Sequence, residues 1–410
     1  MHIITSTDIL LPRAEDMSAW SVIACDQFTA EPDYWAAAEK LAAEKPSTLS
    51  LMLPEAWLHT ARAEGADRRI ADTMRRYLAE GVFQTIPDSF IYVERILPDG
   101  RVRRGLVAAL DLEQYDFTGT QHASVRSTEG TVEERLPPRV RIRRGAPLEM
   151  PHTLLLMDDR TDSVLSLAEK AKTTLEKVYD FDLMLGGGHI TGWRVSGVTK
   201  AAVQAALDAL DNAALQRGKY GDAAENGRLT FAVGDGNHSL AAAKRFWEEK
   251  RETLPPNERQ TDPARFALVE VENIHEPSLD FEPIHRVLFD TDTSDFARSL
   301  AAHRAEWEAK DKTLGERVAA AESFCRAYIA GHGGTIDYIH GDDTARSLGE
   351  KPNCAAVLLP PVEKNGLFLS VLKNGALPKK SFSMGNARDK RYYLECRIIN
   401  PCHKAENVIK

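Results

Sequence analysis

Short apolar runs alternate with segments of helical periodicity along most of the chain. Apolar runs bounded by turn residues predict buried strands, and they cover residues 20–25, 153–158, 229–233 and 265–271. Apolar positions that recur three and four residues apart predict helices, and they cover residues 33–44, 66–80, 163–177 and 199–215. Strands and helices that alternate in this way are typical of a mixed α/β fold.

Two places have the pattern of a β-hairpin. Residues 90–97 and 102–112 are apolar runs separated by Pro98-Asp99-Gly100, which is typical of a tight turn. The second place is the glycine run at 186–188, which has an apolar run on each side. No Gly-Lys-Ser/Thr follows these glycines, so we expect a hairpin turn there and not a phosphate loop.

The pattern changes at two points and indicates three portions. Residues 124–151 are polar, charged and irregular, and a further change falls near residue 290. Beyond it we expect helices over 291–307 and 313–330 and strands over 336–339, 355–359 and 367–371. We therefore expect an N-terminal α/β portion (1–120), a mixed-sheet core (121–290) and an α+β C-terminal portion (291–410).

Composition narrows the function classes. Of 410 residues, 43% are hydrophobic and 28% are charged, as in an ordinary globular protein, and no apolar run is long enough to span a membrane. The first residues lack the pattern of a signal peptide, so we expect a cytoplasmic protein without a membrane partner. A formal net charge of −9 argues against a nucleic-acid partner held by phosphate contacts. The five scattered cysteines form no Cys-x-x-Cys pair, and we expect reduced thiols.

The most informative segment is residues 231–247, where a predicted strand meets an alanine-rich helix. The first N–H groups of a helix and its positive dipole end attract anions, phosphate above all, and glycines allow a ligand to approach the backbone. His238 can titrate near neutral pH and Asp235 can ligate a metal. An ordinary junction with an Asp or Asn cap explains the same residues equally well. The candidate residues at this turn are Gly234, Asp235, Gly236, Asn237, His238 and Ser239.

Two other polar clusters lie between residues 126 and 143. The segment Arg126-Ser-Thr-Glu-Gly-Thr131 combines hydroxyls with a carboxylate, and Glu129 is its natural general base. The alternative is a solvated loop carboxylate. The alternation Arg139-Val-Arg-Ile-Arg143 predicts an extended segment with three guanidinium groups on one face. Such groups bind phosphate or carboxylate, although a solvated strand face paired with nearby acids is the simpler interpretation.

Three further clusters lie elsewhere. His285 and Arg286 follow Pro283 on a short apolar segment, where they could clamp an acid or phosphate or serve only the structure. The segment Pro378-Lys-Lys-Ser381 offers two ammonium groups, which are solvated in most proteins. The acids of residues 158–162 have the composition of a metal site, and a turn with an Asp cap explains them as well.

Taken together, these segments resemble a bacterial and archaeal family known as domain of unknown function family 1015. The resemblance covers nearly the whole chain in order and spacing. The segments that carry it are Val22-Ile-Ala-Cys-Asp26, Thr128-Glu-Gly-Thr131, Glu134-Arg135, Asp235-Gly-Asn-His-Ser239, Ile284-His-Arg286 and Lys380-Ser381.

The turn at 235–239 is also similar to that of the ParB and sulfiredoxin superfamily, which holds nucleotide phosphate and includes free-serine kinases. This resemblance implies a ParB/sulfiredoxin-like core and phosphorylation of a small hydroxyl substrate, free L-serine first, by ATP or ADP. The chain departs from the family pattern at Asn237, which replaces a histidine, and at Ser239, which replaces an arginine. Arg286, Arg126 or Lys244 could supply the missing charge.

The resemblance also implies roles. Backbone N–H groups around Gly236 to Ser239 would hold the donor phosphates, with Gly234 as part of the site and Asp235 on Mg²⁺. His238, His285 and Arg286 would neutralise charge on the transferred group, Glu129 would accept the hydroxyl proton, and Arg126 and Lys380 would add to the phosphate site. The alternatives are a phosphoserine phosphatase and a nucleotide-binding, ParB-like regulator. The expected partners are a nucleotide and a small substrate, with a homodimer as a further expectation.

Overall fold

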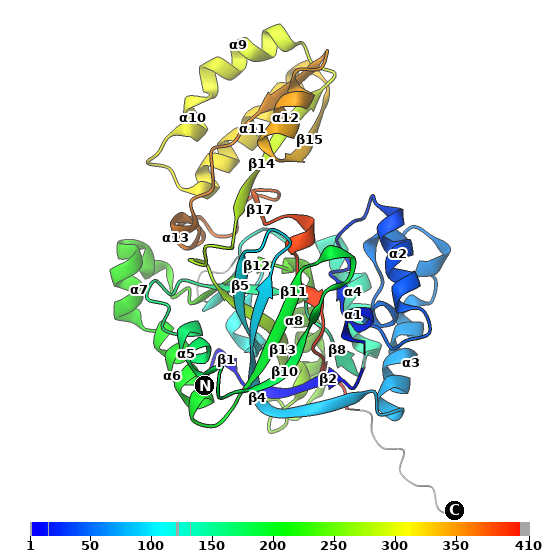
Figure 1. The fold of residues 1–410 in the computed structure, drawn as a ribbon. Helices are drawn as coiled ribbons and strands as arrows, with labels where there is room; N and C mark the ends of the chain where they lie inside the picture. The colour runs from blue at the N-terminus through cyan, green and yellow to red at the C-terminus, as the bar shows by residue number, and fades with distance from the viewer. Residues whose placement is uncertain (1, 15, 120–122, 132, 402–410) are drawn as a thin grey trace, which may run out of the picture.

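The computed structural model describes residues 2–14, 16–119, 123–131 and 133–401. An eleven-stranded sheet forms its centre (Figure 1). Its main path runs, from one edge to the other, through β10 (Glu176–Asp182), β11 (His189–Val195), β4 (Phe83–Ile96), β5 (Val102–Asp111), β13 (Phe266–Asn273), β9 (Leu154–Met157), β12 (Phe231–Asp235), β7 (Val125–Ser127) and β6 (Tyr115–Asp116). The two remaining strands pair beside this path, β1 (Ile4–Thr5) with β5 and β2 (Thr7–Pro12) with β4.

The sheet is mixed. The pairs β13–β9, β12–β7 and β6–β7 are parallel, whereas β4–β5, β5–β13 and β9–β12 are antiparallel. The expected mixed α/β fold class is confirmed at this level. Strands from the expected portions 1–120 and 121–290 are neighbours in this one sheet, so the two stretches share a core.

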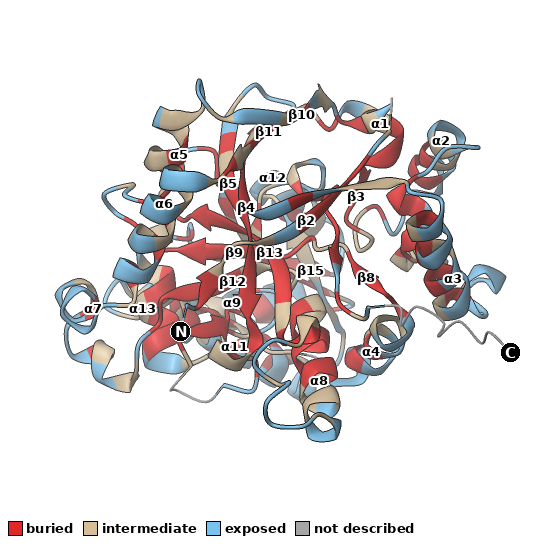
Figure 2. Cartoon of the chain, turned by 90° about the horizontal axis from the view of Figure 1, so that it is seen from below, coloured by how far each residue is buried: buried red, intermediate tan, exposed pale blue. Residues whose placement is uncertain are grey.

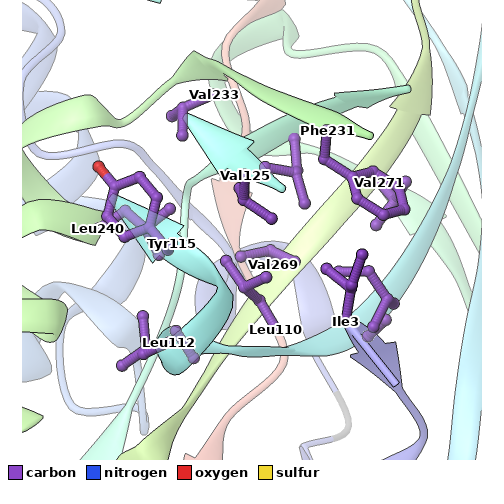
Figure 3. Packing of buried hydrophobic residues seen from close by; sticks show 14 of the residues in the cluster. Ile3, Leu110, Leu112, Tyr115, Val125, Phe231, Val233, Leu240, Val269 and Val271 are labelled. Atoms are coloured by element: carbon purple, nitrogen blue, oxygen red, sulfur yellow. The ribbon is translucent and has the colours of Figure 1, made fainter. Parts of the chain in front are cut away.

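Helices cover both faces of the sheet, and its central strands are therefore buried on both sides (Figure 2). In β4, Phe90 and Tyr92 belong to one hydrophobic core, while Ile91 and Val93 belong to the other, as the two-residue period of a strand requires. The first core includes residues of α5 (Leu165–Ala171), α6 (Gly197–Leu210) and α8 (Asn237–Thr253). Figure 3 shows part of this core, with Leu240 of α8 among the strand residues. The second includes residues of α1 (Met17–Trp20), α2 (Pro32–Ala42) and α3 (Ala66–Ala79).

A smaller lobe projects from this body and is drawn in yellow and orange at the top of Figure 1. Its sheet has the order β15 (Thr335–His340), β14 (Phe281–Phe289), β16 (Cys354–Val357). Four helices accompany it: α9 (Thr293–His303), α10 (Ala305–Glu308), α11 (Leu314–His332) and α12 (Asp342–Gly349). Buried Phe296, Trp307 and Cys325 form a core of its own. Because β14 begins at Phe281, this sheet starts before the expected boundary at residue 290.

The end of the chain returns to the body. After α13 (Lys364–Asn374), β17 (Phe382–Met384) pairs with the first residues of β14. Then β18 (Tyr392–Tyr393) pairs with β3 (Val22–Ile23), and β19 (Arg397–Ile398) pairs with β8 (Leu148–Glu149). The expected portion 291–410 is therefore divided in space between the small lobe and the body.

Both predicted hairpins are confirmed. β4 and β5 are joined by a turn in which the Gly100 N–H donates to the Leu97 carbonyl at 2.8 Å, and β10 pairs with β11 across the glycine run. In the described part of the chain the helices number thirteen, and none of them is long and apolar enough to cross a membrane. Cys25, Cys325, Cys354 and Cys396 are free thiols, and Cys402 lies outside the described residues.

Two predicted strands are wrong. Residues 139–143 lie in α4 (Leu136–Gly145), a helix with prolines in its first turn. Proline is tolerated there because the first N–H groups of a helix have no acceptor within the helix. Its arginines reach acids on different sides, Arg139 with Glu55 and Arg143 with Glu149. Residues 367–371 lie in α13, whose apolar run packs on the body through a helical face. In a short, continuous apolar run, the periodicity does not distinguish a buried strand from a buried helix.

Gly105 of β5 leads to a prediction about stability. A Cβ atom there would lie 2.7 Å from Cγ of Glu270 and closer still to its carboxylate, which pairs with Arg391 at 2.6 Å. We expect Gly105→Ala to lower the free energy of unfolding by about 1–3 kcal/mol, the usual cost of overpacking a core. Urea denaturation measures this change. The control is Gly218→Ala in α7 (Ala213–Tyr220), where a Cβ meets nothing within 4 Å, and a similar loss there would contradict the explanation.

Candidate functional site

The strand-to-helix junction is tighter than the sequence predicts. Asp235 is the last residue of β12 and Asn237 the first of α8, so only Gly236 lies between the two elements. Gly236 has φ of +80°, and a Cβ atom there would lie 2.9 Å from Cα of Thr153. Only glycine fits this position. No side chain caps the N-terminus of α8, and the first N–H groups of a helix have no partner within the helix itself.

A cavity of about 940 Å³ adjoins this junction and is lined by residues from distant parts of the chain. The predicted Glu129, the whole junction from Gly234 to Ser239, and Lys380 line it together. His340, Tyr338 and Arg326 of the small lobe line it as well. The fold therefore brings Glu129 to the junction across more than a hundred residues of sequence.

Glu129 is held by pairing with the segment that precedes β17. The Leu377 N–H donates to the Thr128 carbonyl at 2.8 Å, and the Ser381 N–H donates to Oε1 of Glu129 at 3.3 Å. Burial raises the pKa of Glu129, although the Ser381 N–H and the nearby Lys380 oppose this effect. The carboxylate is a stronger base than an exposed one, which suits proton acceptance.

The lining of the cavity carries opposite charges in nearly equal number. Six side chains are cationic and five are acidic: Arg135, Arg139, Arg326, Lys379, Lys380 and Lys390 against Asp26, Glu55, Glu129, Asp235 and Glu322. Three of the cations pair within the cavity, Arg139 with Glu55, Lys390 with Asp235 and Arg326 with Glu322. The other three cations make no ion pair with any described residue.

Two histidines that line the cavity have lowered pKa values. Burial, together with Arg139, Arg135 and Lys379, lowers the pKa of His238 to about 4. Burial also lowers the pKa of His340, with further contributions from Lys380 and Lys390. Burial is the larger cause of both shifts, and the nearby cations add to it, which favours an anion over a cation beside these rings.

Asp235 does not offer a preformed magnesium site. Its Oδ2 lies 3.2 Å from Nζ of Lys390, and its Oδ1 accepts a hydrogen bond from the Gly236 N–H at 3.0 Å. A cation would have to displace the Lys390 ammonium. In the described ranges no group of three or more His, Cys, Asp or Glu side chains is placed to hold a metal ion. The donor set at Asp235 therefore does not fit the expected Mg²⁺.

His285 and Arg286 do not line the cavity. Both are fully buried in β14. Nε2 of His285 lies 2.8 Å from Asp342, and its Nδ1 accepts a hydrogen bond from the Leu359 N–H. Nε of Arg286 donates to Glu322 at 3.2 Å. These contacts lie within the small lobe, and neither side chain is part of the cavity lining, although the buried Nη2 of Arg286 has no hydrogen-bond partner among the described residues.

Arg126 and Lys244 also lie outside the lining of the cavity. Arg126, on β7, donates to the carbonyls of Ala123 and Asn226. Lys244, on α8, donates to the Leu112 carbonyl at 2.9 Å. Neither takes the place of the family arginine beside the junction.

The acids of residues 158–162 form a turn. Asp159 accepts hydrogen bonds from the N–H groups of Thr161 and Val164, while Asp158 contacts His275 and Tyr220. These contacts agree with an Asp-stabilised turn.

Several residues that line the cavity were not among the candidates, and Asp26, His152 and Lys390 are three of them. Asp26 lines it beside His152 and Lys390, and these neighbours hold its pKa below the ordinary value although burial opposes them. His152 accepts from or donates to the Tyr393 hydroxyl at 2.7 Å. Asp26 ends the family-like segment 22–26 and could have been found from it. His152 and Lys390 carry no local signal.

Comparison with known proteins places the chain in a family. A family model described as protein of unknown function (DUF1015) matches residues 6–397. The chain belongs to this family. No curated protein matches it.

Solved structures with remote similarity include three whose descriptions are informative. A conserved hypothetical protein from Pyrococcus furiosus is 9% identical, with a TM-score of 0.32 over 70% of this chain and 94% of its own. A free serine kinase in complex with AMP is 9% identical, with a TM-score of 0.34 over 70% and 90%. A mutant free serine kinase in complex with ADP is 8% identical, with a TM-score of 0.34 over 72% and 92%. Similarity this remote carries no weight for this DUF1015 protein, so the case for its function rests on its own residues.

His238 provides a direct test of the anion site. Its pKa of about 4 reflects burial and positive surroundings, so an anion bound at the junction must raise it. We expect saturating inorganic phosphate to raise the pKa of His238 in an NMR titration. His189 is the control, because its pKa is raised by Asp182 and Asp180 on a surface hairpin away from the cavity. An equal shift at both rings, or none at His238, would contradict an anion at this junction.

Proposed function

We propose that the cavity is the active site of a small-molecule kinase, which transfers phosphate from a nucleotide to a hydroxyl group. The leading acceptor is free L-serine, with O-phosphoserine as product. The observation that supports this most is the presence of a base, Glu129, in the same cavity as the uncapped N-terminus of α8. A volume of about 940 Å³ accommodates phosphates and a small acceptor together.

The phosphate end of the site would lie at the junction. The N–H groups of residues 237–239 and the positive end of the α8 dipole would hold the donor phosphates. Lys379, Lys380 and Arg135 would neutralise charge on the transferred group, as phosphoryl transfer requires. A ParB/sulfiredoxin-like core around β12 and α8, with ATP or ADP as donor, belongs to the same proposal.

Glu129 would act as the base. As the acceptor oxygen forms its bond to the terminal phosphorus, the bond from that phosphorus to the bridging oxygen breaks, and the nucleotide leaves one phosphate shorter. The hydroxyl proton passes to the carboxylate of Glu129. We assign no step to Mg²⁺, because Lys390 occupies the only carboxylate at the junction itself.

Product analysis tests the proposal. Purified protein is incubated with L-serine and ATP or ADP, each with Mg²⁺ or with a chelator, and phosphoserine is measured by mass spectrometry. We expect phosphoserine with at least one donor. Release of phosphate from phosphoserine without nucleotide would favour the phosphatase. Tight nucleotide binding without any product would favour the regulator, and either result would contradict the kinase.

The role of Glu129 predicts a specific kinetic change. We expect Glu129→Gln to lower kcat by about 10²- to 10⁴-fold with little loss of nucleotide affinity, the usual effect of removing a general base. Because the pKa of Glu129 is raised, wild-type activity should fall as pH falls through a value above the ordinary glutamate range, and the variant should lack this limb.

The matched control is Glu133→Gln, an exposed carboxylate four residues later that pairs with Arg245 at 3.4 Å. It should keep full activity and the acidic limb of the pH profile. Equal activity of Glu129→Gln and the wild type would contradict the assignment of the base.

A further inference from the structure

A second, smaller cavity of about 340 Å³ adjoins the first. The two share part of their lining, namely Cys25, Glu55, Arg135, Arg139, His152 and Ser239. This side chamber therefore opens beside the first turn of α8 and beside two of the arginines.

The walls of the side chamber are apolar. Its lining includes Leu51, Met52, Met74, Ile142, Leu240 and Leu268. These residues come from both hydrophobic cores and from α4, and the chamber lies where the cores meet. Ala243 and Ala267 also line it, and their small side chains leave the space open.

Most charged groups in the chamber wall are paired, whereas Glu134 and Arg135, which also line it, make no ion pair with any described residue. Glu149 accepts hydrogen bonds from Arg143 at 2.5 Å and from Arg397 at 2.7 Å, and Arg139 pairs with Glu55. The His152 ring is bound to the Tyr393 hydroxyl. A charged or strongly polar occupant would find few free partners, whereas an apolar group would lose no hydrogen bonds on entry.

Helix α8 connects the two spaces. Its uncapped N-terminus lies at the polar cavity, and Ser239 lines both cavities. Leu240 and Ala243, three residues apart on one face, line the chamber. A phosphate ester at the N-terminus of α8 would therefore have an apolar space within reach of its organic part.

We propose that the side chamber is a second ligand subsite, which takes an apolar group carried by the phosphate ester bound at α8. The inference rests on the anion site of the proposed function and adds the class of ligand. The apolar group is either a hydrocarbon side chain or the ring of a nucleotide. Free serine has no such group, so the chamber would serve the other reactant or a larger hydroxyl substrate.

Binding of alkyl phosphates tests the subsite. The probes are methyl, butyl and octyl phosphate, with AMP as the ring-bearing probe, measured by calorimetry against inorganic phosphate. If hydrocarbon enters the chamber, affinity should rise about fourfold for each methylene that is buried. If only a nucleotide ring fits, AMP should bind at least tenfold more tightly than methyl phosphate, without a dependence on chain length.

Two variants locate the effect. Ala243→Leu fills the chamber, and Ile142→Gln places a polar group on its half-buried wall. Each variant should reduce the gain in affinity of octyl phosphate or AMP over inorganic phosphate by at least tenfold. Each should leave the affinity for inorganic phosphate itself unchanged. Ala202→Leu, on the exposed face of α6, is the matched control and should change nothing.

The outcomes separate the inference from the proposed function. Equal affinity for all the phosphate esters, or a gain that survives both variants, would overturn the subsite even if phosphoserine is formed. A gain that both variants abolish would support the subsite even if no phosphoryl transfer is detected. Loss of inorganic phosphate binding in both variants, with the control intact, would show that the chamber is part of the anion site and would overturn a separate subsite.

Discussion

The pairing of Thr128 and Gly130 with Leu377 is the constraint on which the candidate site depends. These backbone hydrogen bonds, at 2.8 and 3.3 Å, join two segments about 250 residues apart in the chain. They place Glu129 beside the N-terminus of α8 and, on the other strand, bring Lys379 and Lys380 to the same cavity. Without this pairing, the base and two of the cations would lie on separate loops.

Buried ion pairs anchor the returning segment further along. Arg391 lies between Glu270 and Glu395 at 2.6 Å from each, and Arg397 pairs with Glu149. Burying such charges is costly, so their value lies in the fixed geometry that full pairing imposes. That geometry carries Lys390 into the cavity, where it reaches Asp235. The ion pairs that hold the returning segment on the body therefore also position the Lys390 ammonium beside the junction.

The parts of the fold that the sequence predicts correctly depend on local physics. The hairpin at Gly100 and the junction at Gly236 are encoded within a few residues, because a positive φ and a tight turn require glycine there. The helix α4 was missed because its arginines alternate as in a strand, while their partners come from other elements. Glu129 was identified from the hydroxyls, carboxylate and glycine of its own segment, whereas Lys390 was missed because only long-range pairing brings it to the site.

The cavity and the chamber together follow from how α8 is placed. The chain carries a net charge of −9, yet in the cavity at the start of α8 burial, with a further contribution from nearby cations, lowers the pKa of two histidines. One turn further along, the same helix contributes Leu240 and Ala243 to an apolar space. An electrostatic field selects the anionic part of a ligand but does not distinguish one phosphate ester from another. Specificity must then come from the neighbouring apolar walls, where shape and buried area differ between ligands.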